Sequence, residues 1–74
     1  MITEQQARNL AVRYQAYMEA VATIGTIDAD WAGVRVWGNA LRDTENETGV
    51  QLTKPENRDG LIESADRNLA KVAA

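Results

Sequence analysis

The strongest hydrophobic pattern in the chain runs from Thr3 to Ile24. When successive residues are turned by about 100°, as in an α-helix, the apolar side chains of this stretch fall into one broad stripe. The stripe consists of Ala7, Leu10, Ala11, Tyr14, Tyr17, Met18, Val21, Ala22 and Ile24. Thr3 precedes Gln6 by three residues, the spacing of a capping box, and Gly25 is a residue type at which helices commonly end. The pattern therefore predicts a core-facing helix over residues 4–24.

A second series of small apolar residues lies on the opposite face of this predicted helix. Val12, Ala16 and Ala20 recur at four-residue spacing. One interpretation is that alanine is the best helix former and contacts nothing there. The other is that small side chains allow a second helix to approach closely, either from another protein or from another copy of this chain. The sequence leaves both interpretations open.

A second helix is predicted over residues 28–47, with Thr26 or Asp28 as its N-terminal cap. Its apolar stripe comprises Ile27, Trp31, Val34, Gly38 and Leu41. The signal is weaker than in the first helix because the stretch contains two glycines.

Those glycines open an alternative for residues 33–38. Gly33 and Gly38 each cost about 1 kcal/mol relative to alanine inside a helix, and the residues between them are compatible with a short strand. The only candidate partner for such a strand is the segment 50–52. We favour the helix because a helical pattern continues beyond Gly38 without a turn signal.

A third helix is predicted over residues 55–73. Thr53 and Glu56 have the spacing of a second capping box at its start. Its single apolar stripe comprises Leu61, Ile62, Ala65, Leu69, Val72 and Ala73. Glu63 and Arg67 are spaced to form an ion pair on the exposed side.

Together these patterns predict an all-α fold in which residues 1–74 form one domain, a small three-helix bundle. A chain of 74 residues is near the lower size at which one core sustains a fold, so self-association through the first helix is an open alternative. The predicted core comprises Leu10, Tyr14, Tyr17, Val21, Trp31, Val34, Leu41, Leu61, Ile62, Ala65 and Leu69.

Composition removes several kinds of chemistry. The chain contains no cysteine and no histidine, so thiolate and imidazole groups are missing for catalysis or metal binding. The net charge is −3, and no basic patch favours nucleic acid. No apolar run approaches the length of a membrane span, and no signal peptide is visible. We therefore expect a cytoplasmic, non-enzymatic protein with no cofactor, no metal, no direct nucleic-acid contact and no membrane contact.

The acidic excess is greatest at Asp43, Glu45 and Glu47, near the end of the second predicted helix. This alternation resembles the start of a calcium-binding loop. The match fails because the sixth position is Thr48 instead of glycine and the twelfth is Lys54 instead of glutamate. We interpret the three carboxylates as a solvated acidic face. Negative charge near a helix C-terminus is unfavourable, so a basic partner would offset it.

The predicted function is a non-catalytic interaction in which the chain, as an adaptor or inhibitor, occupies a surface of a partner protein such as a basic groove. The candidate contact residues are Val12, Ala16, Ala20, Trp37, Asp43, Glu45 and Glu47. Trp37 is included because it stands at the edge of the second stripe and tryptophan is frequent among binding hot spots. The alternative is a homodimer or higher oligomer that binds a small ligand between subunits, lined by Arg13, Tyr14 and Tyr17.

Overall fold

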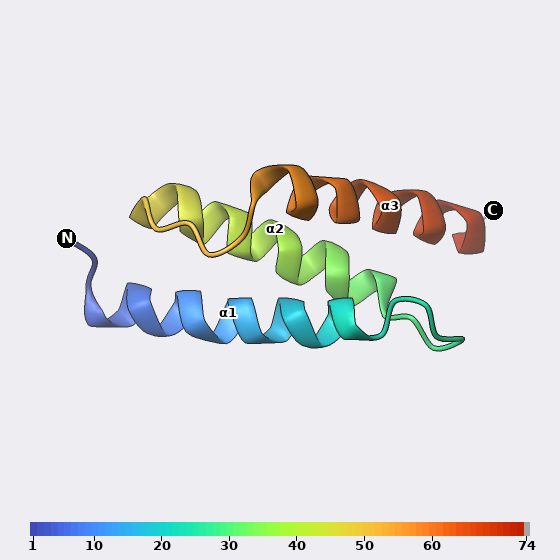
Figure 1. Cartoon of the computed structure of the whole chain (residues 1–74), viewed down its shortest axis with the longest axis horizontal. Helices are drawn as coiled ribbons and strands as arrows, with labels where there is room; N and C mark the ends of the chain where they lie inside the picture. The colour runs from blue at the N-terminus through green and yellow to red at the C-terminus, as the bar shows by residue number, and fades with distance from the viewer. Residues whose placement is uncertain (74) are drawn as a thin grey trace.

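The computed structural model describes residues 1–73, except for the side chain of Ala73, and contains three helices (Figure 1). They are α1 (Glu4–Ala22), α2 (Trp31–Thr48) and α3 (Pro55–Ala73). The predicted all-α three-helix bundle is confirmed. Within residues 1–73, none of the helices is long and apolar enough to cross a membrane.

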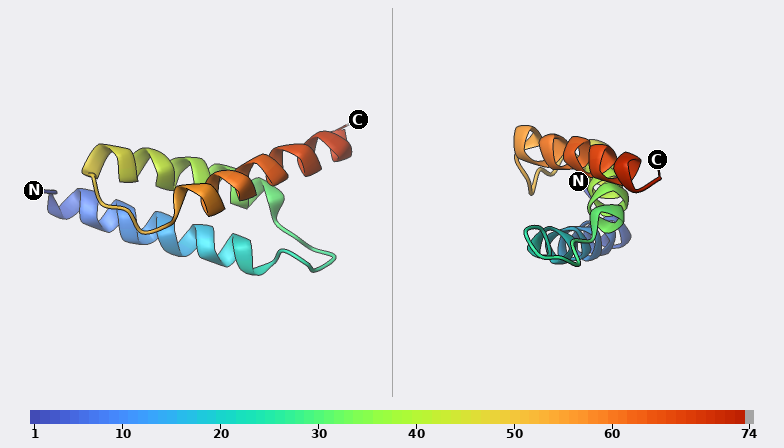
Figure 2. Two further views of the ribbon diagram at one scale, coloured as in Figure 1. Left: turned by 45° about the horizontal axis from the view of Figure 1, so that its top comes forward. Right: turned by 90° about the vertical axis from the view of Figure 1, so that its right-hand side faces the viewer.

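The middle helix, α2, holds the other two together. It runs antiparallel to α1, and α3 runs antiparallel to α2 (Figure 1). Both α1 and α3 pack against α2, but no Cα atom of α1 lies within 8 Å of a Cα atom of α3 in the described chain. The molecule is elongated, 43 × 19 × 18 Å, and its end-on outline is C-shaped (Figure 2). One side of the bundle is therefore open between α1 and α3.

The start of α1 follows the predicted capping box. The Thr3 hydroxyl accepts a hydrogen bond from the Gln6 amide N–H at 3.0 Å, and the Gln6 side chain accepts one from the Thr3 amide N–H at 2.9 Å. The helix ends at Ala22, two residues earlier than predicted. The Thr23 hydroxyl explains the early end, because it donates to the Ala20 carbonyl at 2.6 Å and accepts from the Asp30 amide at 2.8 Å. It thus fixes the loop to the end of α1.

Helix α2 begins at Trp31, three residues later than predicted, and its cap is Asp30 instead of Thr26 or Asp28. The Asp30 carboxylate accepts a hydrogen bond from the Gly33 amide at 2.9 Å. A Cβ atom at Gly33 would lie 2.3 Å from an Asp30 carboxylate oxygen, so glycine makes room for this cap. The strand alternative for residues 33–38 is wrong, since the whole segment is helical.

The core lies where both outer helices contact α2. Its buried apolar residues are Leu10, Tyr17 and Ala20 from α1, Val34 and Leu41 from α2, and Ile62 and Ala65 from α3. Six of these seven were predicted, the exception being Ala20. Tyr14, Val21, Trp31, Leu61 and Leu69 were also predicted to be core, but they are only half-buried. They are less covered than predicted because α1 and α3 do not close over one another.

Gly38 is the point at which the three helices come closest. It is buried, and a Cβ atom there would lie 2.8 Å from Cγ1 of Ile62 and 3.3 Å from Cε1 of Tyr17. Since real Cβ contacts are rarely this short, any larger residue would push α3 or α1 away from α2. Gly38 therefore serves packing within the chain.

The connection from α2 to α3 differs in one detail from the prediction. Gly49 ends α2 with a φ of +76° and donates its N–H to the Glu45 carbonyl at 2.8 Å, a common helix ending. Helix α3 begins at Pro55 as predicted. The capping box between Thr53 and Glu56 does not form, because the Thr53 hydroxyl donates instead to the Glu45 carboxylate, at 3.2–3.3 Å.

Candidate interaction groove

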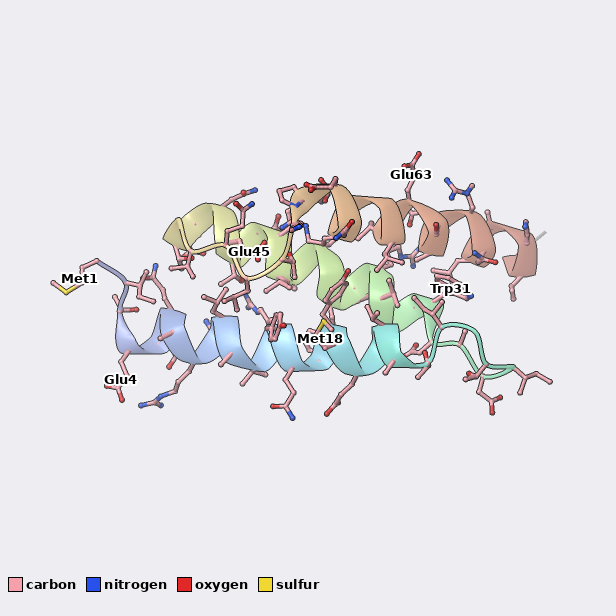
Figure 3. The ribbon with its side chains drawn as sticks, in the orientation of Figure 1. Met1, Glu4, Met18, Trp31, Glu45 and Glu63 are labelled. Carbon is pink, nitrogen blue, oxygen red and sulfur yellow. The ribbon has the colours of Figure 1, made fainter. Side chains whose placement is uncertain are left out.

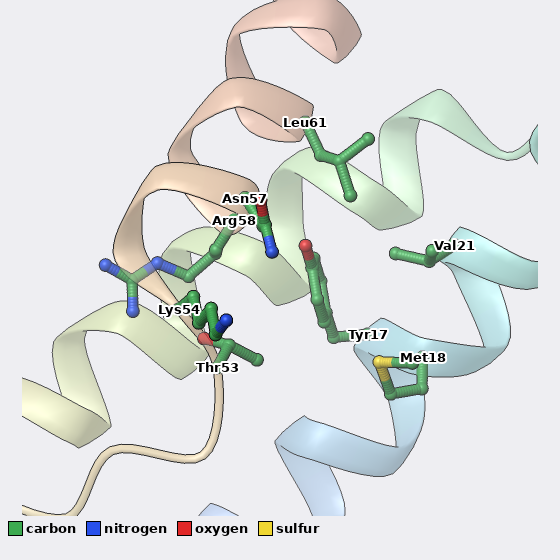
Figure 4. Close-up of a pocket in the computed structure, with 8 residues that line it drawn as sticks. All are labelled: Tyr17, Met18, Val21, Thr53, Lys54, Asn57, Arg58 and Leu61. Carbon is green, nitrogen blue, oxygen red and sulfur yellow. The ribbon is translucent and has the colours of Figure 1, made fainter.

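A groove runs between α1 and α3 and is bordered by the loop that connects α2 to α3. Its volume is about 240 Å³ (Figure 4). The lining residues are Tyr17, Met18 and Val21 from α1, Thr53 and Lys54 from the connecting loop, and Asn57, Arg58 and Leu61 from α3. The groove exists because α2 separates the two outer helices, and the connecting loop borders the gap without filling it.

The α1 wall of the groove is apolar. Leu10 and Tyr17 are buried in the core, whereas Met18, the residue after Tyr17, is 41% exposed. Val21, one turn beyond Tyr17, is half-buried and continues this wall. The broad stripe that predicted α1 is therefore only partly used within the chain.

The opposite wall carries more polar groups. Leu61 contributes its apolar side chain from α3, and Asn57 lies one turn before it (Figure 4). The exposed Lys54 stands at the end of the loop, and it forms no ion pair with the described residues. The groove thus combines an apolar surface with a cation that has no carboxylate partner among residues 1–73.

A buried ion pair beneath the loop fixes the α3 side of the groove. Glu45 lies beside the loop (Figure 3) and pairs with Arg58, with side chains that are 2% and 5% exposed respectively. The same carboxylate accepts hydrogen bonds from the amide N–H groups of Leu52 and Thr53, at 2.8 and 3.0 Å. One buried side chain therefore holds the last residues of the loop and the first turn of α3.

A second carboxylate extends the pair to the surface. Asp59 accepts a hydrogen bond from Nε of Arg58 at 3.1 Å and lies 3.9 Å from a guanidinium nitrogen of Arg42 on α2. On the same side of α2, Arg35 lies 3.8 Å from Asp66 of α3. Charged contacts thus join α2 and α3 in addition to the apolar core.

The charged groups of this cluster affect the pKa of Tyr17. Burial raises the pKa of the Tyr17 phenol above its ordinary value of 10.0, the Arg58 guanidinium opposes the rise, and the carboxylates of Asp59 and Glu45 add to it. The hydroxyl end of the ring points across the groove towards α3 (Figure 4). Tyr17 therefore presents a neutral hydroxyl to the groove at neutral pH.

The predicted contact stripe on the outer face of α1 is placed differently by the structure. Ala20 is 4% exposed and belongs to the core, so its assignment to an outer surface is wrong. Ala16 is half-buried, and Val12 is 61% exposed. Trp37 is 36% exposed, at the surface of α2, as its place at the edge of the stripe indicated. Only Val12 and Trp37 of this group remain freely accessible.

The three predicted acidic contacts are also separated. Asp43 is exposed, and Glu47 is exposed and accepts a hydrogen bond from the Gln6 side chain at 3.0 Å. Glu45 is buried in the pair with Arg58, so the interpretation of all three as a solvated acidic face is wrong. The positive charge that balances Glu45 comes from Arg58 of α3 in the same chain.

The residues of the alternative ligand site do not converge. Arg13 donates a hydrogen bond to the Thr44 hydroxyl on α2, and so points away from the groove. Tyr14 packs against the edge of the core, and only Tyr17 lines the groove.

The buried pair of Glu45 and Arg58 was not predicted, since Glu45 was assigned to a partner contact and Arg58 to no site, although the sequence carries a signal for it. Glu45 follows Leu41 by four residues and continues the buried stripe of α2 by one turn. Arg58 precedes Ile62 by four residues and continues the stripe of α3 in the same way. Because antiparallel neighbours bring these ends together, opposite charges on the two stripes are expected to pair.

Among residues 1–73, no group of three or more histidine, cysteine, aspartate or glutamate side chains could hold a metal ion. Comparisons with protein-family models, with curated proteins and with solved structures gave no match.

Proposed function

We propose that the chain is a small non-catalytic interaction module that binds an amphipathic helix of a partner protein in the groove between α1 and α3. The observation that carries the proposal is the separation of α1 from α3, which leaves Met18 exposed and Val21 and Leu61 half-buried along an open channel. A helix laid in an apolar groove is a common mode of protein recognition, read out by residues at three- and four-residue spacing.

The chemistry of the lining supports a binding role over a catalytic one. No carboxylate lines the groove, and its polar groups are the Tyr17 hydroxyl, the Asn57 amide, the Thr53 hydroxyl and the charged ends of Lys54 and Arg58. Arg58 is already neutralised by Glu45. Lys54 is the group that would meet a carboxylate on the incoming helix, which gives the groove a charge preference at its edge.

A helix in the groove would contact both α1 and α3, and so complete a four-helix arrangement around the core. The apolar surface of Met18 and Leu61 would then leave water. In this proposal the module acts by occupying a helix of its partner, as an adaptor or inhibitor does.

The test uses a photo-crosslinking amino acid at Met18, with Glu63 as the matched control site. Glu63 is exposed on α3 and points away from the other helices (Figure 3). We expect a crosslinked product from position 18 and none from position 63. The product's mass tells a second copy of this chain from another protein, and its crosslinked residues identify the bound segment.

The affinity of the purified partner is then measured for the wild type and for the variants Met18→Glu and Glu63→Lys. Met18→Glu is expected to weaken the affinity by about tenfold or more, because a charged side chain replaces apolar surface in the α1 wall of the groove, and Glu63→Lys is expected to leave it within about twofold. Equal crosslinking from positions 18 and 63, or an affinity that Met18→Glu leaves unchanged, would contradict the proposal.

A further inference from the structure

A row of α1 residues on the groove side is only partly covered by the chain's own packing. Ala7, Ala11 and Met18 are exposed, and Tyr14 and Val21 are half-buried. In an α-helix these positions lie on one flank, next to the buried flank that contains Leu10 and Tyr17. We call these five residues, from Ala7 to Val21, the free stripe of α1.

The free stripe is symmetric about Tyr14. Ala7 and Val21 lie seven residues before and after it, and Ala11 and Met18 lie three residues before and four after. In an antiparallel pair of α1 helices with a two-fold axis at Tyr14, Ala7 of one copy faces Val21 of the other, and Ala11 faces Met18. Each small side chain then meets a larger one, which is the self-complementarity that a two-fold interface requires.

The charges beside the stripe fit the same arrangement. Arg8 and Glu19 lie on one flank of α1, six residues before and five residues after Tyr14, and both are exposed. Within its own helix Arg8 pairs with Glu4 at 2.7 Å, and Glu19 accepts a hydrogen bond from Gln15 at 3.3 Å. A two-fold axis across an antiparallel pair brings equal flanks together, so Arg8 of one copy lies beside Glu19 of the other. The contact occurs twice in the dimer.

We propose that a second copy of this chain occupies the groove, with its α1 packed antiparallel along the free stripe. This inference rests on the proposed function, since it names the helix that the groove receives. It moves the predicted self-association of α1 from the face of Val12 and Ala16 to the face of Ala11 and Met18.

The test is molar mass by light scattering from micromolar to millimolar protein, with circular dichroism to verify folding. The wild-type chain is expected to approach twice 8.1 kDa as concentration rises. Ala11→Glu is expected to remain a folded monomer, because position 11 is exposed in the single chain and buried in the dimer. Gln5→Glu, at an exposed position on the face of α1 opposite the free stripe, is the control and is expected to dimerise like the wild type.

Charge reversal tests the register. Arg8→Glu and Glu19→Arg each place two pairs of like charges in the interface, and each is expected to raise the dissociation constant by about fivefold to tenfold. The double variant restores opposite charges and is expected to return to within about twofold of the wild type. A double variant as weak as the single variants would overturn the antiparallel register.

The two proposals fail in different ways. A wild-type chain that stays monomeric up to millimolar concentration overturns the second copy as occupant, while a crosslink from Met18 to another protein still supports the groove. A dimer that survives both Ala11→Glu and Met18→Glu also overturns the inference, since the interface then lies elsewhere. The groove itself is rejected when position 18 yields no crosslink that position 63 does not also yield.

Discussion

Glu45 of α2 and Arg58 of α3 form an ion pair that is almost closed to water, with only 2% and 5% of their side chains exposed. The Glu45 carboxylate also binds the amide N–H groups of Leu52 and Thr53. Burying charges is unfavourable unless each is paired and hydrogen-bonded, and here both conditions are met. The pair therefore determines the path of the loop and the place at which α3 starts.

Removing one member of this pair should be severe. Arg58→Leu leaves the Glu45 carboxylate buried without its counter-charge, and we expect a loss of about 3–5 kcal/mol in the free energy of unfolding. The free energy of unfolding of a small domain is about 0.05–0.15 kcal/mol per residue, so this loss is a large part of the total stability. Urea denaturation followed by far-UV circular dichroism measures the loss.

The matched control is Arg67→Leu. Arg67 lies 3.8 Å from Glu63 in an exposed pair, and its loss should change the free energy of unfolding by less than about 0.5 kcal/mol. The double variant Glu45→Gln/Arg58→Leu should recover part of the stability, because a neutral amide oxygen can still accept the loop N–H groups. Equal effects of Arg58→Leu and Arg67→Leu would show that the buried pair stabilises the fold no more than the exposed pair does.

Two glycines should respond to alanine with opposite signs. Gly38→Ala gains helix propensity, but its Cβ would lie 2.8 Å from Ile62, so we expect a net loss of about 1–3 kcal/mol. Gly60 lies inside α3 with no atom within 4 Å of the added Cβ, so Gly60→Ala should stabilise by about 0.5–1 kcal/mol. Thermal unfolding of the two variants compares them directly. A stabilised Gly38→Ala would mean that the helices do not approach at this residue.

The cap of α2 can be tested by comparing two aspartates. Asp30→Ala removes the acceptor of the Gly33 amide and should cost about 1 kcal/mol in the free energy of unfolding. Asp28→Ala is the control, because Asp28 is exposed in the preceding loop and does not cap the helix. Denaturant titrations under the same conditions should separate the two. The reverse order of effects would assign the cap to Asp28.

Alkaline pH should weaken the fold through Tyr17. Its pKa is raised in the folded state, chiefly by burial, so the unfolded chain loses the phenolic proton first as the pH rises above 10.0. Stability from this group is complete below that pH and is lost as the pH approaches the folded pKa. Tyr17→Phe should show a smaller decrease in the urea midpoint above pH 10.0, whereas Tyr14→Phe should retain the wild-type decrease because Tyr17 is still present. Identical decreases in the wild type and Tyr17→Phe would exclude this contribution.

Two features that depend on residues within about one helical turn were predicted correctly. One is the Thr3–Gln6 capping box, and the other is the Glu63–Arg67 pair, whose partners lie on the same helix. The presence and type of all three helices followed from apolar periodicity. The end of α1 was placed too late because the Thr23 hydroxyl bonds the Asp30 amide seven positions away. The start of α2 was placed too early because Asp30, and not Thr26 or Asp28, caps the helix.

Features that depend on the neighbouring helix were not predicted from the pattern. Asp43, Glu45 and Glu47 were assigned to one acidic face, yet only Glu45, which continues the stripe of Leu41, faces α3 and is buried. Ala20 resembles Ala16 and lies one turn away, yet it is covered by the core. In each case the side of the helix on which the neighbour packs decides the environment.

The sequence by itself determined three amphipathic helices and most of the core, because periodicity and local hydrogen bonds require no knowledge of the neighbours. Tertiary structure decided that α2 separates α1 from α3, since Gly38 brings both helices against α2 and the Glu45–Arg58 pair holds the start of α3 in place. This separation leaves the free stripe of α1 only partly covered and opens the groove.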